Sequence, residues 1–298
     1  MLQLAVILVD GVIYASWLFV VAAGLTLVYG VMRILNLAHG SLYAIGAYTG
    51  ASAVGGYLSV GYPLAGAYLL LSVGAIAVGA VVGLIVERGV FRAMYGRDEA
   101  VMLLVTYAVL LILEDAIRLV WGVESYATYA LYESLGTSKL GPLSFANYDL
   151  CLVGIAAVVG LSLWWGLNQT RKGKLLRVVI HDREVAAALG IDVTRVFVGT
   201  FVVGSGLGAL AGALTAPAIS VVPGMGVEVI VLAFAVVVIG GLGSIEGAMI
   251  GALIVGVGRA AAVHLWAEAE LFVVYAVMSV VLAIRPGGLL AQPQARKI

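Results

Sequence analysis

The chain has 298 residues, of which 63% are hydrophobic and only 11% are charged, and its mean hydropathy is +1.14. Soluble globular proteins carry about 45–50% apolar and about 25% charged residues, so this composition excludes a soluble domain and predicts an integral membrane protein. Sixteen basic residues balance sixteen acidic ones. No excess of positive charge is left for phosphate groups, which argues against a nucleic-acid partner.

The apolar residues form runs long enough to cross a bilayer. A membrane helix needs about 20 of them, so the chain has room for about eight to ten spans. The runs lack the alternating pattern of an outer-membrane barrel and are rich in Ala, Leu and Gly. We therefore predict an all-α, polytopic transmembrane helical bundle that forms one transmembrane domain over residues 1–298. The expected spans are 4–29, 41–58, 62–86, 101–121, 149–167, 196–216, 228–240, 245–263 and 271–284.

The basic residues predict the orientation, because short loops rich in Lys and Arg stay in the cytoplasm. Residues 168–195 form the most basic loop, whereas residues 122–148 contain two acidic residues and only Lys139 as a base. We expect 168–195 to be cytoplasmic and 122–148 to be external. The N-terminus is then outside and the C-terminus is in the cytoplasm, in a multi-pass protein of the cytoplasmic (inner) membrane.

A polar break precedes the second span. Asn36, His39 and Ser41 surround Gly40 there. Unwound backbone within a membrane must line a cavity or be buried in protein, because lipid cannot satisfy its N–H and C=O groups. These four residues are therefore candidates for a translocation path or a hinge. His39 has a plainer alternative role, which is to satisfy nearby backbone groups.

The fourth span contains ionisable residues, which within a membrane are functional candidates by default. Glu114 and Arg118 are four residues apart, a spacing that brings two side chains together on one helix face. We predict a structural ion pair between them.

Within the basic loop, residues 182–189 are typical of a short helix that ends at Gly190. Val185, Ala188 and Leu189 lie on one face of that helix. A small exposed apolar face suits docking to a soluble partner. The alternative is a solvated loop whose charges only set the orientation.

Glycine is abundant, with 39 residues. The stripe Gly204, Gly208 and Gly212 predicts close packing of helices. A second break follows a run of only about a dozen apolar residues, which is short for a span and favours a discontinuous half-helix. Its candidate path or hinge residues are Gly241, Gly243, Ser244 and Glu246.

Several motifs are absent from the sequence. It contains no G-x-x-x-x-G-K-[ST] for nucleotide phosphates, no H-E-x-x-H and no G-x-S-x-G. Three widely spaced histidines and one cysteine predict no metal site and no disulfide framework. We expect no cofactor and a protein that is not an enzyme.

At these segments the sequence resembles the permease subunits of ATP-binding-cassette (ABC) importers for branched-chain amino acids, in particular the shorter, LivH-type permease. The resemblance covers nearly the whole chain and is strongest in Asn36–Ser41, Gly173–Arg177, Ala186–Ile191, Ile239–Ser244 and Gly247–Gly251.

The resemblance implies a transport subunit whose partners are a second permease, identical or distinct, two cytoplasmic ATPase subunits and an external solute-binding protein. Glu184, Ala187 and Gly190 would then couple the chain to the ATPase. The family often has an acidic pair before this helix, whereas residues 181–184 are His-Asp-Arg-Glu here.

Two other functions compete with this one. An ion-coupled secondary transporter would use a membrane-buried acid such as Glu114 or Glu246 to carry an ion. An intramembrane enzyme would use His39 as a base and Ser41 or Ser244 as a nucleophile, but no motif supports it.

Overall fold

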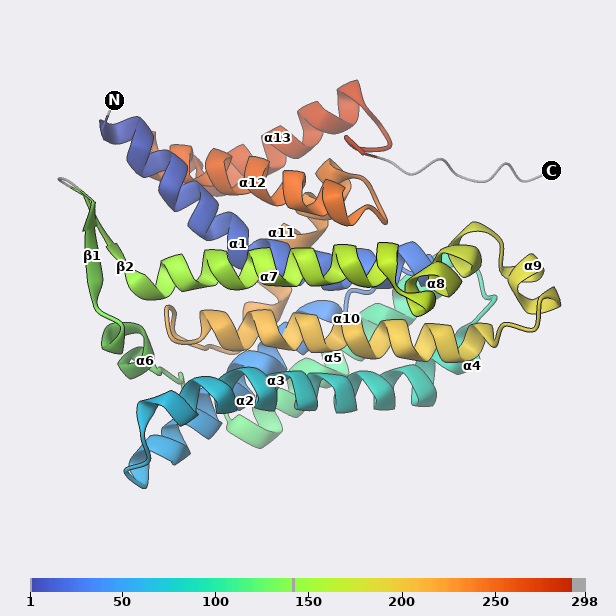
Figure 1. The fold of residues 1–298 in the computed structure, drawn as a ribbon, viewed down its shortest axis with the longest axis horizontal. Coiled ribbons are helices and arrows are strands. Elements are labelled where there is room, and N and C mark those ends of the chain that lie inside the picture. The colour runs from blue at the N-terminus through green and yellow to red at the C-terminus, as the bar shows by residue number, and fades with distance from the viewer. Residues whose placement is uncertain (1, 141–142, 291–298) are drawn as a thin grey trace.

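The computed structural model describes residues 2–140 and 143–290, and these residues form an elongated bundle of helices (Figure 1). The long helices are α1 (Leu2–Met32), α2 (His39–Ser59), α3 (Leu64–Val86), α5 (Glu99–Trp121), α7 (Asn147–Gln169), α10 (Val193–Thr215), α11 (Met225–Gly240), α12 (Ile245–Leu265) and α13 (Glu270–Ile284). The shorter elements are a π-helical turn at Glu87–Phe91, α4 (Arg92–Met94), α6 (Tyr129–Ser134), β1 (Thr137–Leu140), β2 (Leu143–Ala146), α8 (Arg171–His181), α9 (Arg183–Ala188) and a 3-10 turn at Ala267–Ala269.

A helix stands at each of the nine predicted spans, which confirms the polytopic helical bundle. Among the described residues, six helical segments are long and apolar enough to cross a membrane by themselves. The expected half-helix at 228–240 is α11, with 16 residues, and α13 has 15. The predicted spans and the observed helices agree because a continuous helix forms all of its own backbone hydrogen bonds, as a segment in lipid must where water is absent.

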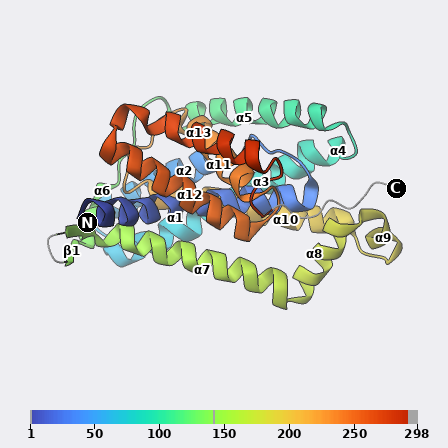
Figure 2. The same cartoon turned by 90° about the horizontal axis from the view of Figure 1, so that it is seen from above.

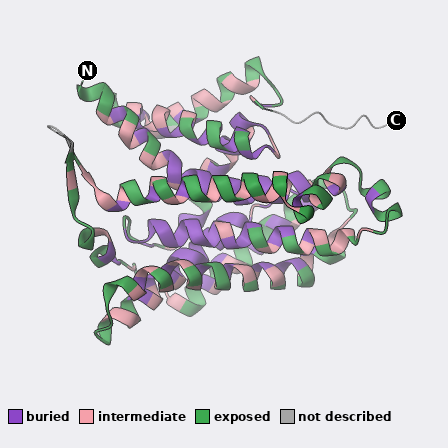
Figure 3. Cartoon of the chain, in the orientation of Figure 1, coloured by how far each residue is buried: buried purple, intermediate pink, exposed green. Residues whose placement is uncertain are grey.

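The centre of the bundle is built on α1 and α10. The second half of α1 is almost completely buried from Leu18 onward, and α10 packs against α1, α2 and α3. Figure 3 shows α10 largely purple, whereas α7 in front of it is mostly green. α12 packs along α1 and also contacts α13. Seen from above, α7 and α5 lie at opposite edges of the bundle (Figure 2).

The two ends of the bundle differ in structure. At one end lie the N-terminus, α6 and an antiparallel hairpin in which Thr137 faces Ala146 (Figure 1). α8 and α9 project from the opposite end. The predicted external loop is therefore folded and contains two short strands, which the all-α prediction for the spans did not include. The basic stretch at 171–177 is also helical, as the first part of α8. Arg296 and Lys297 belong to the C-terminal tail that the sequence predicts to be cytoplasmic, and they lie outside the described residues.

Candidate functional site

The first polar break turns the chain back into the bundle. α1 ends at Met32, and Arg33 adopts a left-handed conformation with φ 57°. The chain then returns alongside α1, so that Nε2 of His39 lies 3.1 Å from the carbonyl oxygen of Val21. Val21 precedes Met32 by eleven residues, or about 16 Å of helix. α2 therefore begins deep inside the bundle, as a discontinuous segment would.

The polar residues of this break are buried in protein. Asn36, His39 and Ser41 have no exposed surface. The His39 ring lies in a niche beside Gly24 and Gly208, where an added Cβ would come within about 3 Å of the ring. The side-chain amide of Asn36 has no hydrogen-bond partner among the residues that the structure describes. A buried polar group without a hydrogen bond lowers the stability of the folded state, so the Asn36 side chain destabilises the fold at this break.

Glu114 joins this break to the start of α11. Its Oε1 lies 3.3 Å from Oγ of Ser41, and it accepts a hydrogen bond from the backbone of Gly224, the residue that precedes α11. Gly40 and Gly226 approach so closely that a Cβ on either would overlap the carbonyl group of the other. The N-terminal ends of α2 and α11 therefore meet here, and the carboxylate of Glu114 lies at the positive end of the α11 dipole.

The predicted ion pair between Glu114 and Arg118 is wrong. Arg118 pairs with Asp115 instead, at 3.5 Å between Nη1 and Oδ1. Both of those side chains are more than half exposed, whereas Glu114 is buried. The buried carboxylate takes its hydrogen bonds from Ser41 and Gly224, and the exposed cation bonds to the exposed acid three residues before it.

The second break lies between α11 and α12. Gly241 and Gly243 have φ values of 108° and 86°, which favour glycine. Ser244 then caps α12 by accepting a hydrogen bond from the Gly247 backbone at 3.0 Å. Gly243 lies against Gly30 near the end of α1. Both breaks therefore contact α1.

Glu246 is separated from the buried side of this break. It is exposed, and it lines an apolar groove of about 610 Å³ between α1, α7 and α12.

The predicted coupling helix exists as α9. Asp182 caps its start by accepting from the backbone N–H groups of Glu184 and Val185, and Gly190 follows it with φ 79°. The candidate coupling residues Glu184, Ala187 and Gly190 are all exposed at the far end of the bundle. Leu189 is 70% exposed. The helix and its exposure are confirmed, and its docking to an ATPase stays a prediction.

Arg183 was not singled out by the sequence, although it connects α9 to the rest of the bundle. Its Nη2 donates to the carbonyl oxygens of Val31, at 3.2 Å, and Met32, at 2.7 Å. Its guanidinium also stacks on the Phe197 ring at 4.9 Å. Burial and the neighbouring Arg33 lower the pKa of Arg183 from its usual value. These contacts attach α9 to the last turn of α1, directly before the first break.

A polar cavity at the hairpin end was also missed. Its volume is about 920 Å³, and α1, α11 and α12 contribute charged residues to its wall. Nε2 of His264 lies 2.7 Å from Oδ2 of Asp10, and Arg259 forms an ion pair with Glu270. Glu228, on the first turns of α11, also lines the cavity. The sequence does not predict this cavity, because its residues are up to 265 positions apart in the chain.

The described residues contain no group of three or more His, Cys, Asp or Glu side chains placed to hold a metal ion.

Comparison with known proteins finds matches over nearly the whole chain. The model of the family described as "Branched-chain amino acid transport system / permease component" matches residues 7–282. The chain is similar to the high-affinity branched-chain amino acid transport system permease protein LivH of Salmonella typhimurium, with 30% identity over 97% of this chain and 96% of that protein. It is also similar to BraD of Pseudomonas aeruginosa, a permease of the same description, with 28% identity over 98% of this chain and 97% of that protein. The probable LivH of Methanocaldococcus jannaschii is 29% identical over 88% of this chain and 82% of its own length.

Proposed function

Because the chain belongs to the permease family of branched-chain amino acid transport systems, we propose that it is a transmembrane subunit of an ATP-driven importer for branched-chain or related amino acids. ATP hydrolysis then takes place on partner subunits, and this chain provides one side of the path through the cytoplasmic membrane. The relatives support this function over an ion-coupled secondary transporter.

The proposed mechanism rests on one contact, in which Arg183 at the start of α9 binds the end of α1 directly before the first break. Glu184 and Ala187 on α9 and Gly190 after it are exposed to the solvent, and Arg183 at the start of α9 is bonded to Val31 and Met32. A displacement of α9 by an ATPase subunit therefore acts directly on the end of α1. The break that follows leads to His39 in the core, so a movement at the surface reaches the middle of the bundle along one continuous segment.

The solute path in this proposal includes the polar cavity and the two breaks. Glu228 on α11 lines the cavity, and the start of α11 lies against Gly40 and Glu114. The glycine contacts Gly40–Gly226 and Gly30–Gly243 give smooth backbone surfaces without side chains. We infer that these contacts are the hinges about which the bundle changes between outward-open and inward-open states.

The assembly in this proposal has four kinds of component besides lipid. They are this chain, a second permease, a pair of ATPase subunits on the side of α8 and α9, and a solute-binding protein on the opposite side. Residues 168–195 are then the cytoplasmic coupling segment, and residues 122–148 with their hairpin face the outside. The N-terminus is outside and the C-terminus is inside.

The experiment is ATP-driven uptake of leucine into vesicles that contain the complete transporter. We expect Glu184→Lys and Gly190→Val to abolish both uptake and copurification of the ATPase. The first reverses a charge on the docking surface, and the second puts a β-branched residue at φ 79°, where it strains the end of α9.

The control is Glu133→Lys, which reverses an exposed charge at the other end of the bundle and is expected to leave ATPase binding unchanged. The coupling assignment is overturned if both α9 variants retain uptake and ATPase binding. Uptake by this chain alone that stops when an uncoupler is added would instead establish the ion-coupled alternative.

A further inference from the structure

A groove separate from the proposed solute path opens at the α8 end of the bundle. Its volume is about 550 Å³, and α1, α7, α8 and α10 form its walls. Most of its lining is apolar, including Leu27, Leu163, Leu167 and Val203. Two basic residues, Lys172 and Arg195, also line it, and both are exposed. An apolar channel with a cationic rim is complementary to a lipid with an anionic headgroup.

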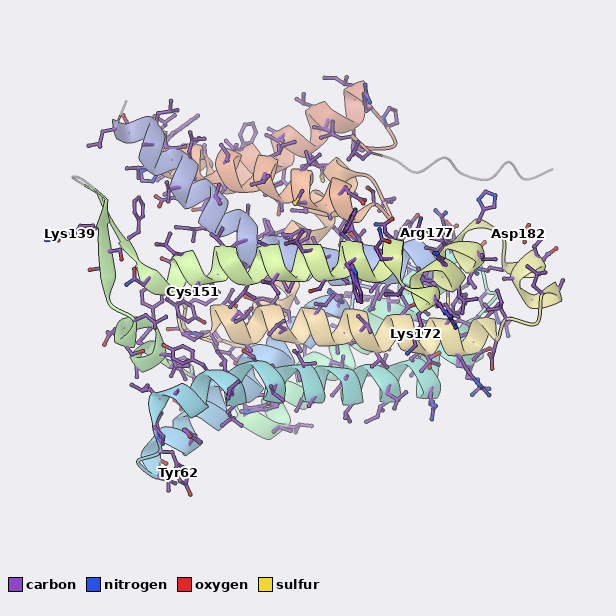
Figure 4. The ribbon with its side chains drawn as sticks, viewed as in Figure 1. Tyr62, Lys139, Cys151, Lys172, Arg177 and Asp182 are labelled. Atoms are coloured by element: carbon purple, nitrogen blue, oxygen red, sulfur yellow. The ribbon has the colours of Figure 1, made fainter. Side chains whose placement is uncertain are left out.

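The corner between α7 and α8 holds the basic rim in place. Oγ1 of Thr170 donates to the Gly166 carbonyl at 2.5 Å and accepts from the Gly173 backbone at 3.0 Å. Gly173 packs directly on the backbone of Gly166 and Leu167, so α8 folds tightly against the end of α7. Lys172 lies at this corner (Figure 4). The first turn of α8, which carries the positive end of the helix dipole, therefore lies at the same rim.

Arg195 completes the rim from α10. Its Nε bonds to Asp192 at 2.8 Å, and its side chain is 87% exposed. That ion pair engages the Nε side of the guanidinium, so the Nη groups retain donors suited to phosphate oxygens.

A buried hydroxyl group lies deeper in the groove. Thr200 is 3% exposed, and its Oγ1 has no hydrogen-bond partner among the described residues. It follows Arg195 by five residues, or about 7.5 Å along α10. Ser162 on α7 also lines the groove. A phospholipid has hydrogen-bond acceptors at two depths, with the phosphate at the membrane surface and the ester carbonyls below it. The groove matches both, because its cations lie at the rim and its hydroxyl groups lie deeper.

We propose that this groove is a binding site for an anionic phospholipid. Lys172, Arg195 and the start of α8 hold the phosphate, and Thr200 donates to an ester carbonyl. One acyl chain lies along Leu163, Leu167 and Val203. The site fixes α8, and hence the segment that leads to α9, to the surface of the bilayer.

The test is native mass spectrometry of the full chain in detergent, with phosphatidylglycerol and phosphatidylcholine of identical acyl chains as probes. We expect the wild-type chain to retain phosphatidylglycerol preferentially. K172Q with R195Q should reduce its binding about tenfold, because two charge-assisted contacts are lost. The matched control R88Q with R97Q removes two exposed charges from the segment between α3 and α5, which does not line the groove, and its binding should stay within about twofold of wild type.

A second pair of variants tests the apolar part of the site. Gly199 lines the groove, and a Cβ added there meets nothing within 4 Å. G199L should therefore fill the groove without disturbing the fold and should reduce the binding of phosphatidylglycerol. Gly154 on α7 is equally unobstructed but does not line the groove, so G154L is its control.

The proposal is overturned if phosphatidylcholine binds as well as phosphatidylglycerol, or if R88Q with R97Q weakens binding as much as the rim variant. It is also overturned if glycerol 3-phosphate alone displaces the lipid, since the groove would then contribute nothing. Unchanged binding by G199L would likewise exclude this groove as the site.

Discussion

At the scale of single residues, Arg183 is the contact on which the proposed coupling depends. It caps the last turn of α1 by donating to the Val31 and Met32 carbonyls, which is favourable for a cation at a helix C-terminus. Arg183→Gln should destabilise the chain by about 1–3 kcal/mol, because charged hydrogen bonds to buried acceptors are lost. We also expect ATP hydrolysis by the assembled transporter to continue while leucine uptake falls. Thermal unfolding and paired hydrolysis and uptake assays measure the two effects.

Arg177→Gln is the matched control at this scale. Arg177 donates to the Leu167 carbonyl at 2.6 Å and to Oδ1 of Asn168 at 3.0 Å, so it also secures a helix end. That helix is α7, which does not lead into a break. Arg177→Gln should therefore reduce stability but leave the ratio of leucine uptake to ATP hydrolysis the same as in the wild type. If both variants lowered the ratio of uptake to hydrolysis equally, the proposed role of Arg183 in coupling would be contradicted.

At the scale of elements, the sequence predicted most of what local chemistry determines. The positions of the nine long helices among the described residues follow from apolar runs, and α9 follows from Asp182 as a cap and Gly190 as a stop. The breaks were predicted because polar residues and glycines interrupt those runs. The partners within the site were not predicted, because they depend on contacts between distant segments. Arg183 and Val31 are 152 residues apart, and Glu114 bonds to Gly224 rather than to its neighbour on the helix.

The glycine stripe of α10 supports a prediction about this packing. Gly212 crosses α2 so closely that a Cβ there would overlap the carbonyl group of Tyr43. Gly212→Ala should separate α10 from α2 and destabilise the chain by about 1–3 kcal/mol through overpacking. Gly74 on α3 has nothing within 4 Å of an added Cβ, so Gly74→Ala should be neutral or stabilising by up to about 1 kcal/mol through helix propensity. Thermal unfolding followed by size-exclusion chromatography compares them, and equal stability of the two variants would refute the close crossing.

At the scale of the whole molecule, the ends of the bundle differ in charge as well as in structure. The end with α8 and α9 carries the basic loop, and the end with the hairpin carries the N-terminus. Since basic loops stay in the cytoplasm, the hairpin end should face outward. Cys151 is the only cysteine, so Cys151→Ser gives a background for single-cysteine labelling. In intact cells, a membrane-impermeant maleimide should label Ser138→Cys on β1. It should label Lys174→Cys on α8 only after the membrane is opened, and the reverse pattern would invert the orientation and move the proposed ATPase surface to the outside.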